Sequence, residues 1–175
     1  MVEHSRDLRL EAARYALGDL SSDELTRIAD ALLIQGVYLP SIGELATGRG
    51  LVMEEAGPLF EYTLRQLGVD LPSREEAIWA LLRHHIRRVA NGDVAPREGL
   101  QSVLHLYDRA GLHGRSQVYV GDSHGIQGLI GAYWQYQDVL GRPFGEALET
   151  DVEGLRALDD FVLHEATGWI GEHGA

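Results

Sequence analysis

Apolar side chains recur through most of this sequence at the three- and four-residue spacing of an α-helix. The clearest case follows a capping box made by Ser73 and Glu76, where the apolar stripe is Ile78, Leu81, Leu82, Ile86 and Val89. Ser21 and Glu24 form a second capping box before a similar stripe of Leu25, Ile28, Ala29, Leu32 and Leu33. A strand would instead alternate with a period of two, so the pattern predicts helices rather than a sheet.

Glycine and proline residues separate these apolar stripes and set the expected element boundaries. We expect helices over about 6–17, from the Ser21 cap to Gly36, as a short turn over 42–46, and over 54–68, 73–91, 96–111, 126–140 and 151–170. Pro58 is expected in the first turn of its helix, where a proline is tolerated. The sequence therefore predicts an all-α, bundle-like fold, a single compact domain of six to eight amphipathic helices over residues 1–175.

One alternative to a purely helical fold stays open. Gly36 to Leu39 and Gln117 to Val120 are short enough, and apolar enough, to pair as one two-stranded β element.

Two residue types are missing from the 175-residue chain. The absence of cysteine excludes disulfides, thiolate nucleophiles and cysteine-ligated metal centres. The absence of lysine excludes Schiff-base chemistry and a P-loop, which both need an ε-amine. No apolar run is long enough to suggest a membrane span and no secretory signal is evident, so we expect a cytoplasmic protein without membrane contact.

The formal net charge is −12, and it is unevenly distributed along the chain. Residues 116–175 carry ten acidic and two basic side chains, whereas residues 74–115 carry five acidic and seven basic ones. An acidic protein repels phosphate backbones, so we expect no nucleic-acid partner. The same charge attracts a basic protein.

The segment Gly121–Gly125 reads Gly-Asp-Ser-His-Gly, which matches the G-x-S-x-G pattern of a nucleophile elbow. A serine nucleophile needs a histidine base and an acid that orients it. In the chain order of α/β hydrolases, these partners of Ser123 would be Asp138, Asp159 or Asp160, followed by His164.

The hydrolase interpretation of this motif requires a central sheet before and after the elbow. Both flanks show helical periodicity instead. We therefore favour a glycine-rich turn in which Asp122 or Ser123 caps the following helix.

The segment Arg83–Arg88 reads Arg-His-His-Ile-Arg-Arg and is the most basic part of the chain. Helical spacing places Arg83 and Arg87 on one side, with His84 and Arg88 on its flank. His85 falls near the apolar stripe, so we expect it to be at least half-buried with a hydrogen-bond partner. The arginines can hold an anion, but we favour pairing with carboxylates from a neighbouring helix.

Histidines are numerous, but their spacing predicts no metal site. The sequence holds neither an H-E-x-x-H pattern nor a Glu-x-x-His pair. Asp160 and His164 share a helix side, yet one such pair is not a ligand set. We expect no metal and no other cofactor.

The last third of the chain is aromatic as well as acidic. Tyr133 and Trp134 are expected in the core, and Tyr136 and Asp138 on the surface. Exposed aromatic groups framed by carboxylates are typical of a surface that binds a basic protein. The acidic residues of this region are Asp138, Glu146, Glu149, Asp151, Glu153, Asp159 and Asp160.

These observations favour a non-enzymatic, acidic protein-binding module. Small acidic inhibitors of basic nucleases, such as bacterial immunity and antitoxin proteins, are similar in size and charge. The candidate binding residues are Arg83, His84, Arg87, Arg88, Tyr136, Asp138, Asp159 and Asp160. Association of the chain into a homodimer stays open.

The alternative is an enzyme whose site lies where the Gly121–Gly125 turn meets the Arg83–Arg88 helix. Its acid–base groups would be Asp122, Ser123, His124 and His164, and Arg83 or Arg87 would hold an anionic substrate.

Overall fold

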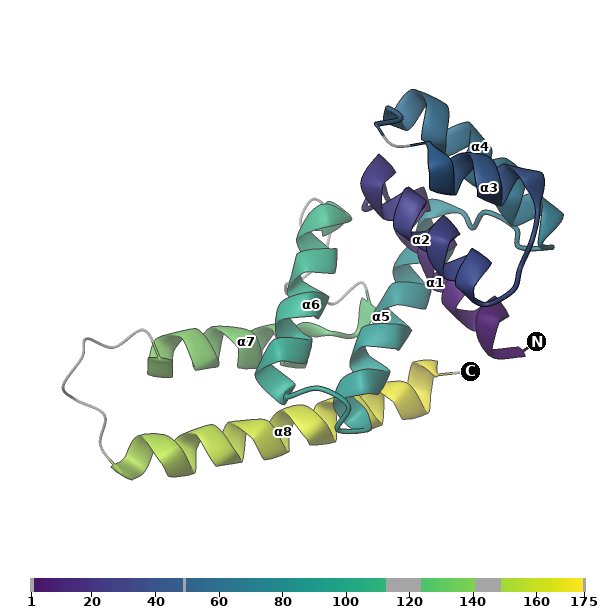
Figure 1. Ribbon diagram of the computed structural model, residues 1–175. Helices are drawn as coiled ribbons and strands as arrows, with labels where there is room; N and C mark the ends of the chain where they lie inside the picture. The colour runs from purple at the N-terminus through teal and green to yellow at the C-terminus, as the bar shows by residue number, and fades with distance from the viewer. Residues whose placement is uncertain (1, 49, 113–123, 141–148, 175) are drawn as a thin grey trace. The chain divides into compact units, whose positions relative to one another are not determined.

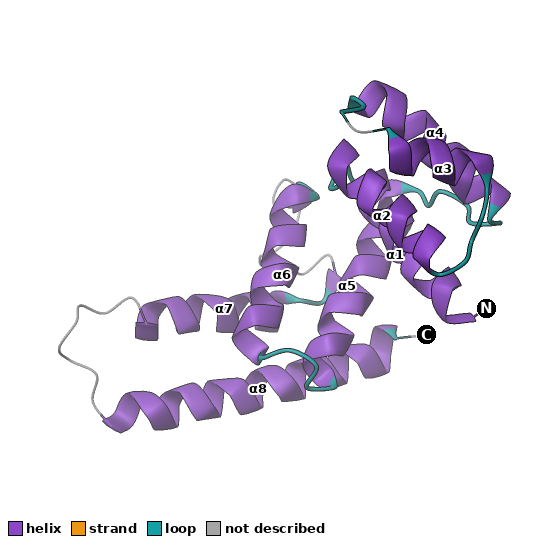
Figure 2. Ribbon diagram, viewed as in Figure 1, coloured by secondary structure: helices purple, strands orange, loops and turns teal. Residues whose placement is uncertain are grey.

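The computed structural model describes residues 2–48, 50–112, 124–140 and 149–174, and within these ranges no residue lies in a β-strand (Figure 2). Eight α-helices account for most of the described residues, which confirms the all-α prediction. Their bounds are α1 (Val2–Ala16), α2 (Ser22–Ile34), α3 (Pro40–Thr47), α4 (Met53–Gln66), α5 (Arg74–Ala90), α6 (Pro96–Arg109), α7 (Gln127–Leu140) and α8 (Glu149–His173).

The alternative with two short strands is not found where the structure describes it. Gly36 forms a turn and residues 37–39 have no regular secondary structure. The other expected strand, Gln117 to Val120, lies outside the described residues. None of the described helices is both long and apolar enough to cross a membrane.

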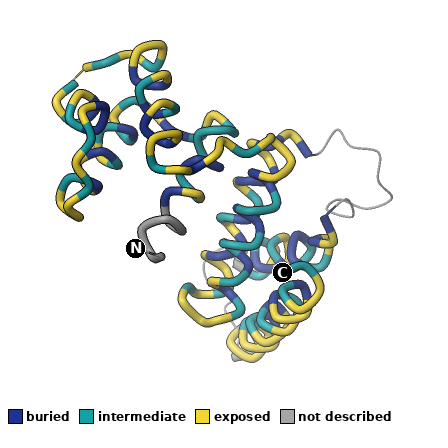
Figure 3. The backbone as a smooth tube through the Cα atoms, turned by 90° about the vertical axis from the view of Figure 1, so that its right-hand side faces the viewer, coloured by how far each residue is buried: buried dark blue, intermediate teal, exposed yellow. Residues whose placement is uncertain are grey.

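The chain divides into two compact units, residues 1–80 and residues 81–175, and the boundary falls inside α5. Each unit has buried apolar residues on one side of its helices, as Figure 3 shows by the alternation of buried and exposed positions. A single domain over residues 1–175 stays a prediction.

In the first unit, α2, α3 and α4 pack against one another in all three pairs. A shared apolar core joins them to α1 and includes Leu25 and Ile42 as well as Phe60. Tyr15 of α1 stacks at a tilt on Phe60, with ring centroids 5.3 Å apart, and donates its hydroxyl to Glu61 at 2.9 Å. Burial, followed by this carboxylate, raises the pKa of Tyr15 to about 12.

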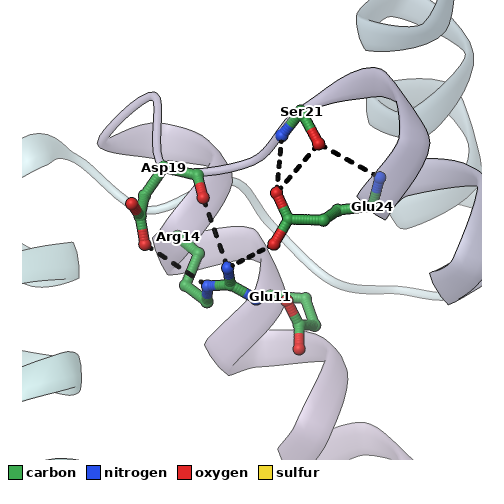
Figure 4. A network of polar contacts seen from close by, with 5 residues as sticks. All are labelled: Glu11, Arg14, Asp19, Ser21 and Glu24. Atoms are coloured by element: carbon green, nitrogen blue, oxygen red, sulfur yellow. Dashed lines mark hydrogen bonds and ion pairs between the residues drawn. The ribbon is translucent and has the colours of Figure 1, made fainter.

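The connection from α1 to α2 is fixed by a polar network around Arg14 (Figure 4). The guanidinium lies 3.1 Å from Glu11, 3.4 Å from Asp19 and 2.8 Å from Glu24. Glu24 also accepts the Ser21 backbone N–H at 2.9 Å, while its own N–H donates to Ser21 Oγ at 3.3 Å. The predicted capping box is therefore present, and it is tied to the preceding helix.

The start of α4 differs from the expected one. The helix begins at Met53, so Pro58 is its sixth residue and lies in the second turn rather than in the first. Proline has no N–H, and the Glu54 carbonyl consequently loses its usual helical donor. Pro58 is exposed, where water can satisfy that carbonyl, so the helix continues through it to Gln66.

In the second unit, α6, α7 and α8 pack against one another pairwise. Helices α7 and α8 lie side by side (Figure 1). Their contacts run in opposite directions along the chain, because Gly128 lies against Glu165 whereas Tyr136 contacts Asp159. The two helices are therefore antiparallel.

The helix starts predicted at Ser73 and Pro96 are confirmed. Ser73 Oγ accepts the Glu76 N–H at 3.3 Å, and the Glu76 carboxylate accepts the Ser73 N–H at 2.8 Å. Gly92, with a φ of 74°, ends the turn after α5 in the left-handed conformation expected of the Asn91-Gly92 stop. Helix α8 is longer than expected at both ends.

Candidate functional site

One long side of α8 is exposed. Its buried residues Leu158, Val162, Ala166 and Trp169 are spaced three and four apart, so they form a single side that packs in the unit. The remaining positions include two large apolar side chains, Val152 at 55% and Phe161 at 43% exposure. Exposed carboxylates accompany them at Glu153, Asp160 and Glu172.

The expected outward orientation of Tyr136 is wrong. Tyr136 is only 2% exposed, and its hydroxyl donates to Asp159 of α8. Burial, then this hydrogen bond, raises the pKa of Tyr136 above its ordinary value. The helical spacing explains the orientation, because Tyr136 follows the buried Leu129 and Ala132 by seven and four residues.

The expected burial of Trp134 is also wrong, since this side chain is 56% exposed. Trp134 lies two residues before Tyr136 and so projects from a different side of α7. Its ring meets that of the half-buried Tyr133 edge to face, with centroids 5.5 Å apart. Two of the predicted acidic binding residues are exposed. They are Asp138, which follows this aromatic cluster on α7, and Asp160 of α8.

The basic segment Arg83–Arg88 lies in α5. Arg87 donates to the Gly174 carbonyl at 2.9 Å, so its partner is a backbone group rather than the carboxylate that we favoured from the sequence. Arg83 and His84 are half-buried, whereas Arg88 is exposed. His85 is half-buried as expected, and its ring meets that of His84 edge to face at 5.3 Å.

The glycine-rich turn is described only from His124 onward, so the roles predicted for Asp122 and Ser123 fall outside the described residues. His124 is 1% exposed, and its carbonyl accepts the indole N–H of Trp169 at 2.8 Å. The ring of His173 stacks on Trp169 with centroids 4.7 Å apart. The C-terminal end of α8 therefore makes two contacts. Trp169 binds the turn at His124, and Gly174, just after the helix, binds Arg87 of α5.

His164 is exposed on α8, five residues before the buried Trp169. At about 100° per residue, this spacing turns His164 some 140° away from the side that meets His124. The structure thus does not bring His164 and His124 together. Within the described ranges, no group of three or more His, Cys, Asp or Glu side chains is arranged to hold a metal ion.

Sequence reasoning missed two features of this unit. It did not select Phe161, and it did not anticipate that His173 stacks on Trp169. The exposure of Phe161 could have been predicted from helical spacing. Phe161 lies between Leu158 and Val162 in sequence, but it projects from a different side of the helix than their buried stripe. The second depends on a contact across the end of the helix.

Comparisons of this chain with protein-family models, curated proteins and solved structures find no match. Inference about function therefore depends on the geometry and charge of the chain itself.

Proposed function

We propose that this protein is an acidic protein-binding module, and that it engages a basic partner protein through the exposed side of α8. The observation that carries the proposal is the combination of one large exposed apolar group, Phe161, with exposed carboxylates on that helix side. Phe161 supplies apolar contact area, and Glu153 and Asp160 lie on the same exposed side, whereas Val152, nine residues before Phe161, projects from the opposite side of the helix. An apolar centre with a charged rim is the usual composition of a protein interface.

The charge of α8 supports a basic partner. Residues 152–172 carry five acidic side chains and a single arginine. Opposite charge on the partner speeds the diffusional encounter and aligns the two surfaces, while a partner of like charge is repelled. An inhibitor of a basic enzyme would have this composition, and it would need no catalytic group of its own.

The proposal is tested by reversing the charge on the exposed side of α8. A control variant carries the same change of net charge at another place in the chain. Glu153→Arg with Asp160→Arg removes the acidic rim of α8. Asp30→Arg with Asp70→Arg changes two exposed acids of the first unit and alters the net charge equally. Each chain is immobilised, exposed to a cell lysate at low ionic strength, and the retained proteins are identified by mass spectrometry.

We expect the wild type and the control variant to retain the same basic protein, with release at high salt because the contact is electrostatic. The α8 variant should retain at least tenfold less of it. Equal retention by both variants would show that net charge rather than α8 attracts the protein, and the proposal would then be abandoned.

A further inference from the structure

Six exposed residues of α8 follow the spacing of a coiled-coil seam. Successive intervals of three, four, three, four and three residues separate them, and we call them the α8 seam: Gly154, Ala157, Phe161, His164, Gly168 and Gly171. Residues with this heptad spacing form one narrow stripe along a helix, which is the stripe that a second helix packs against. The buried stripe of α8 is a different one, so the α8 seam lies on an exposed side of the helix.

The fold itself gives no steric reason for the glycines of the seam. A Cβ atom added to Gly154, Gly168 or Gly171 would have no described atom within 4 Å. None of the three has a positive φ. Glycine inside a helix is unfavourable relative to alanine, because it gains nothing from packing and loses more backbone freedom. A partner backbone that must approach closely does require small residues at such positions.

Phe161 marks the middle of the seam. Its ring is the largest exposed apolar group on this side of α8, and in the heptad pattern Ala157 precedes it and His164 follows it. An exposed aromatic group in such a stripe is suited to enter the space between side chains of a facing helix, in the manner of a knob entering a hole.

Acidic residues flank the seam on both sides. Glu153 and Asp160 each precede a seam residue, whereas Glu165 and Glu172 each follow one. Flanking positions of this kind choose the partner of a helix through their charge. A second copy of α8 would place like charges opposite one another, so complementarity requires lysine or arginine on the facing helix.

Building on the proposed function, we infer that the basic partner presents an amphipathic α-helix that packs lengthwise on the α8 seam. The helix would place apolar residues around Phe161 and basic residues opposite Glu153, Asp160 and Glu172. Seventeen residue steps separate the two ends of the seam. The contact is thus about 26 Å long, or nearly five helical turns.

Two synthetic peptides provide the probe. The first has 21 residues, with leucine at heptad positions a and d and arginine at the flanking positions, and the second differs only by a central proline that breaks the helix. Binding to the full chain is measured by fluorescence anisotropy, and peptide helicity by circular dichroism. We expect the helical peptide to bind at least tenfold more tightly than its proline counterpart, and to gain helicity when bound.

Substitutions in the seam then locate the contact. Gly168→Leu places a bulky side chain in the seam and should weaken binding of the helical peptide at least tenfold. Thr167→Leu adds similar bulk at the adjacent exposed position outside the seam and should leave binding unchanged. Gly168→Ala should raise the melting temperature of the chain and still weaken binding, a combination that a purely structural role for Gly168 does not produce.

Three outcomes of the peptide titrations would overturn the inference: equal binding of the two peptides, binding of neither, or unchanged binding by Gly168→Leu. It would also fail if sedimentation showed a dimer of the chain that Gly168→Leu dissociates, because a second copy would then occupy the seam. The proposed function is tested separately by the charge-reversal capture. It survives if capture depends on Glu153 and Asp160 while the helical peptide shows no preference.

Discussion

Arg14 places its guanidinium among the carboxylates of Glu11, Asp19 and Glu24, and thereby joins the end of α1 to the cap of α2. The group is partly exposed, so each ion pair alone is worth little. The Glu24 carboxylate takes part in two interactions, because it contacts Arg14 and also accepts the Ser21 N–H. A single residue, Glu24, thus completes the capping box of α2 and links that cap to the end of α1.

The electrostatics of Glu24 predict how stability depends on pH. The Ser21 N–H, followed by Arg14, lowers the pKa of Glu24 from 4.5 to about 2. Because the folded-state value lies below the unfolded one, the stabilisation is complete above about pH 5 and is lost as the pH falls towards 2. We expect Glu24→Gln to cost about 1 kcal/mol at pH 7 and to reduce the further loss in acid, as measured by urea unfolding at several pH values.

Glu44 is a matched control for this prediction, since it is exposed on α3. Glu44→Gln should follow the wild-type profile. If Glu24→Gln lost as much stability in acid as the wild type does, the network around Arg14 would not account for the acid sensitivity.

At the scale of the helices, α8 shows how one element can serve two purposes. One stripe, centred on Leu158, Val162 and Trp169, packs in its own unit. The α8 seam carries small and aromatic residues on another side, where stability would favour larger helix formers. A helix that keeps glycine at exposed positions sacrifices some stability, and binding is the use that we propose for them.

Substitution of two glycines by alanine should have opposite effects on the stability of the chain. Gly168→Ala is expected to stabilise the chain by about 1 kcal/mol, because the position is helical and open. Gly125→Ala should destabilise it, since Gly125 has a φ of 66°, a conformation that residues with a Cβ rarely adopt. Urea unfolding of both variants measures the difference, and a loss of stability in Gly168→Ala would reveal a packing role that the described residues do not show.

The boundaries of the helices could largely be predicted where a side chain marks them. Ser21, Ser73 and Pro96 each begin a helix at the expected place, since caps and N-terminal prolines act through local hydrogen bonds and φ angles. Pro58 was misplaced because its helix begins earlier, at Met53, after Val52, whose side chain offers no capping oxygen. Local signals alone do not reveal such a start.

At the scale of the whole molecule, charge is the dominant property. A net charge of −12 on 175 residues creates a field that attracts a basic partner before contact, independently of how the chain is folded. Under the proposed function, the exposed side of α8 would then determine where the partner binds. The first property controls the rate of encounter, and the second controls how long the complex lasts.

These two contributions differ in their response to salt. We expect the association rate constant of the helical basic peptide to fall about tenfold or more between low and high ionic strength, because screening shortens the range of the field. The dissociation rate constant should change much less. Stopped-flow fluorescence measures both. An association rate that ignores ionic strength would mean that the acidic charge plays no part in recognition.

The helical class, several helix starts and the acidic character of this protein could be predicted without coordinates, since they follow from residue spacing, local hydrogen bonds and charge. The packing of α7 against α8 was needed to learn that Tyr136 and Asp159 face each other inside the second unit, whereas Trp134 and Asp160 face outward. The physical reason is that a helix with several apolar residues around its circumference has more than one side to offer. Its neighbours select which side is buried, and the side left over is the one available to a partner.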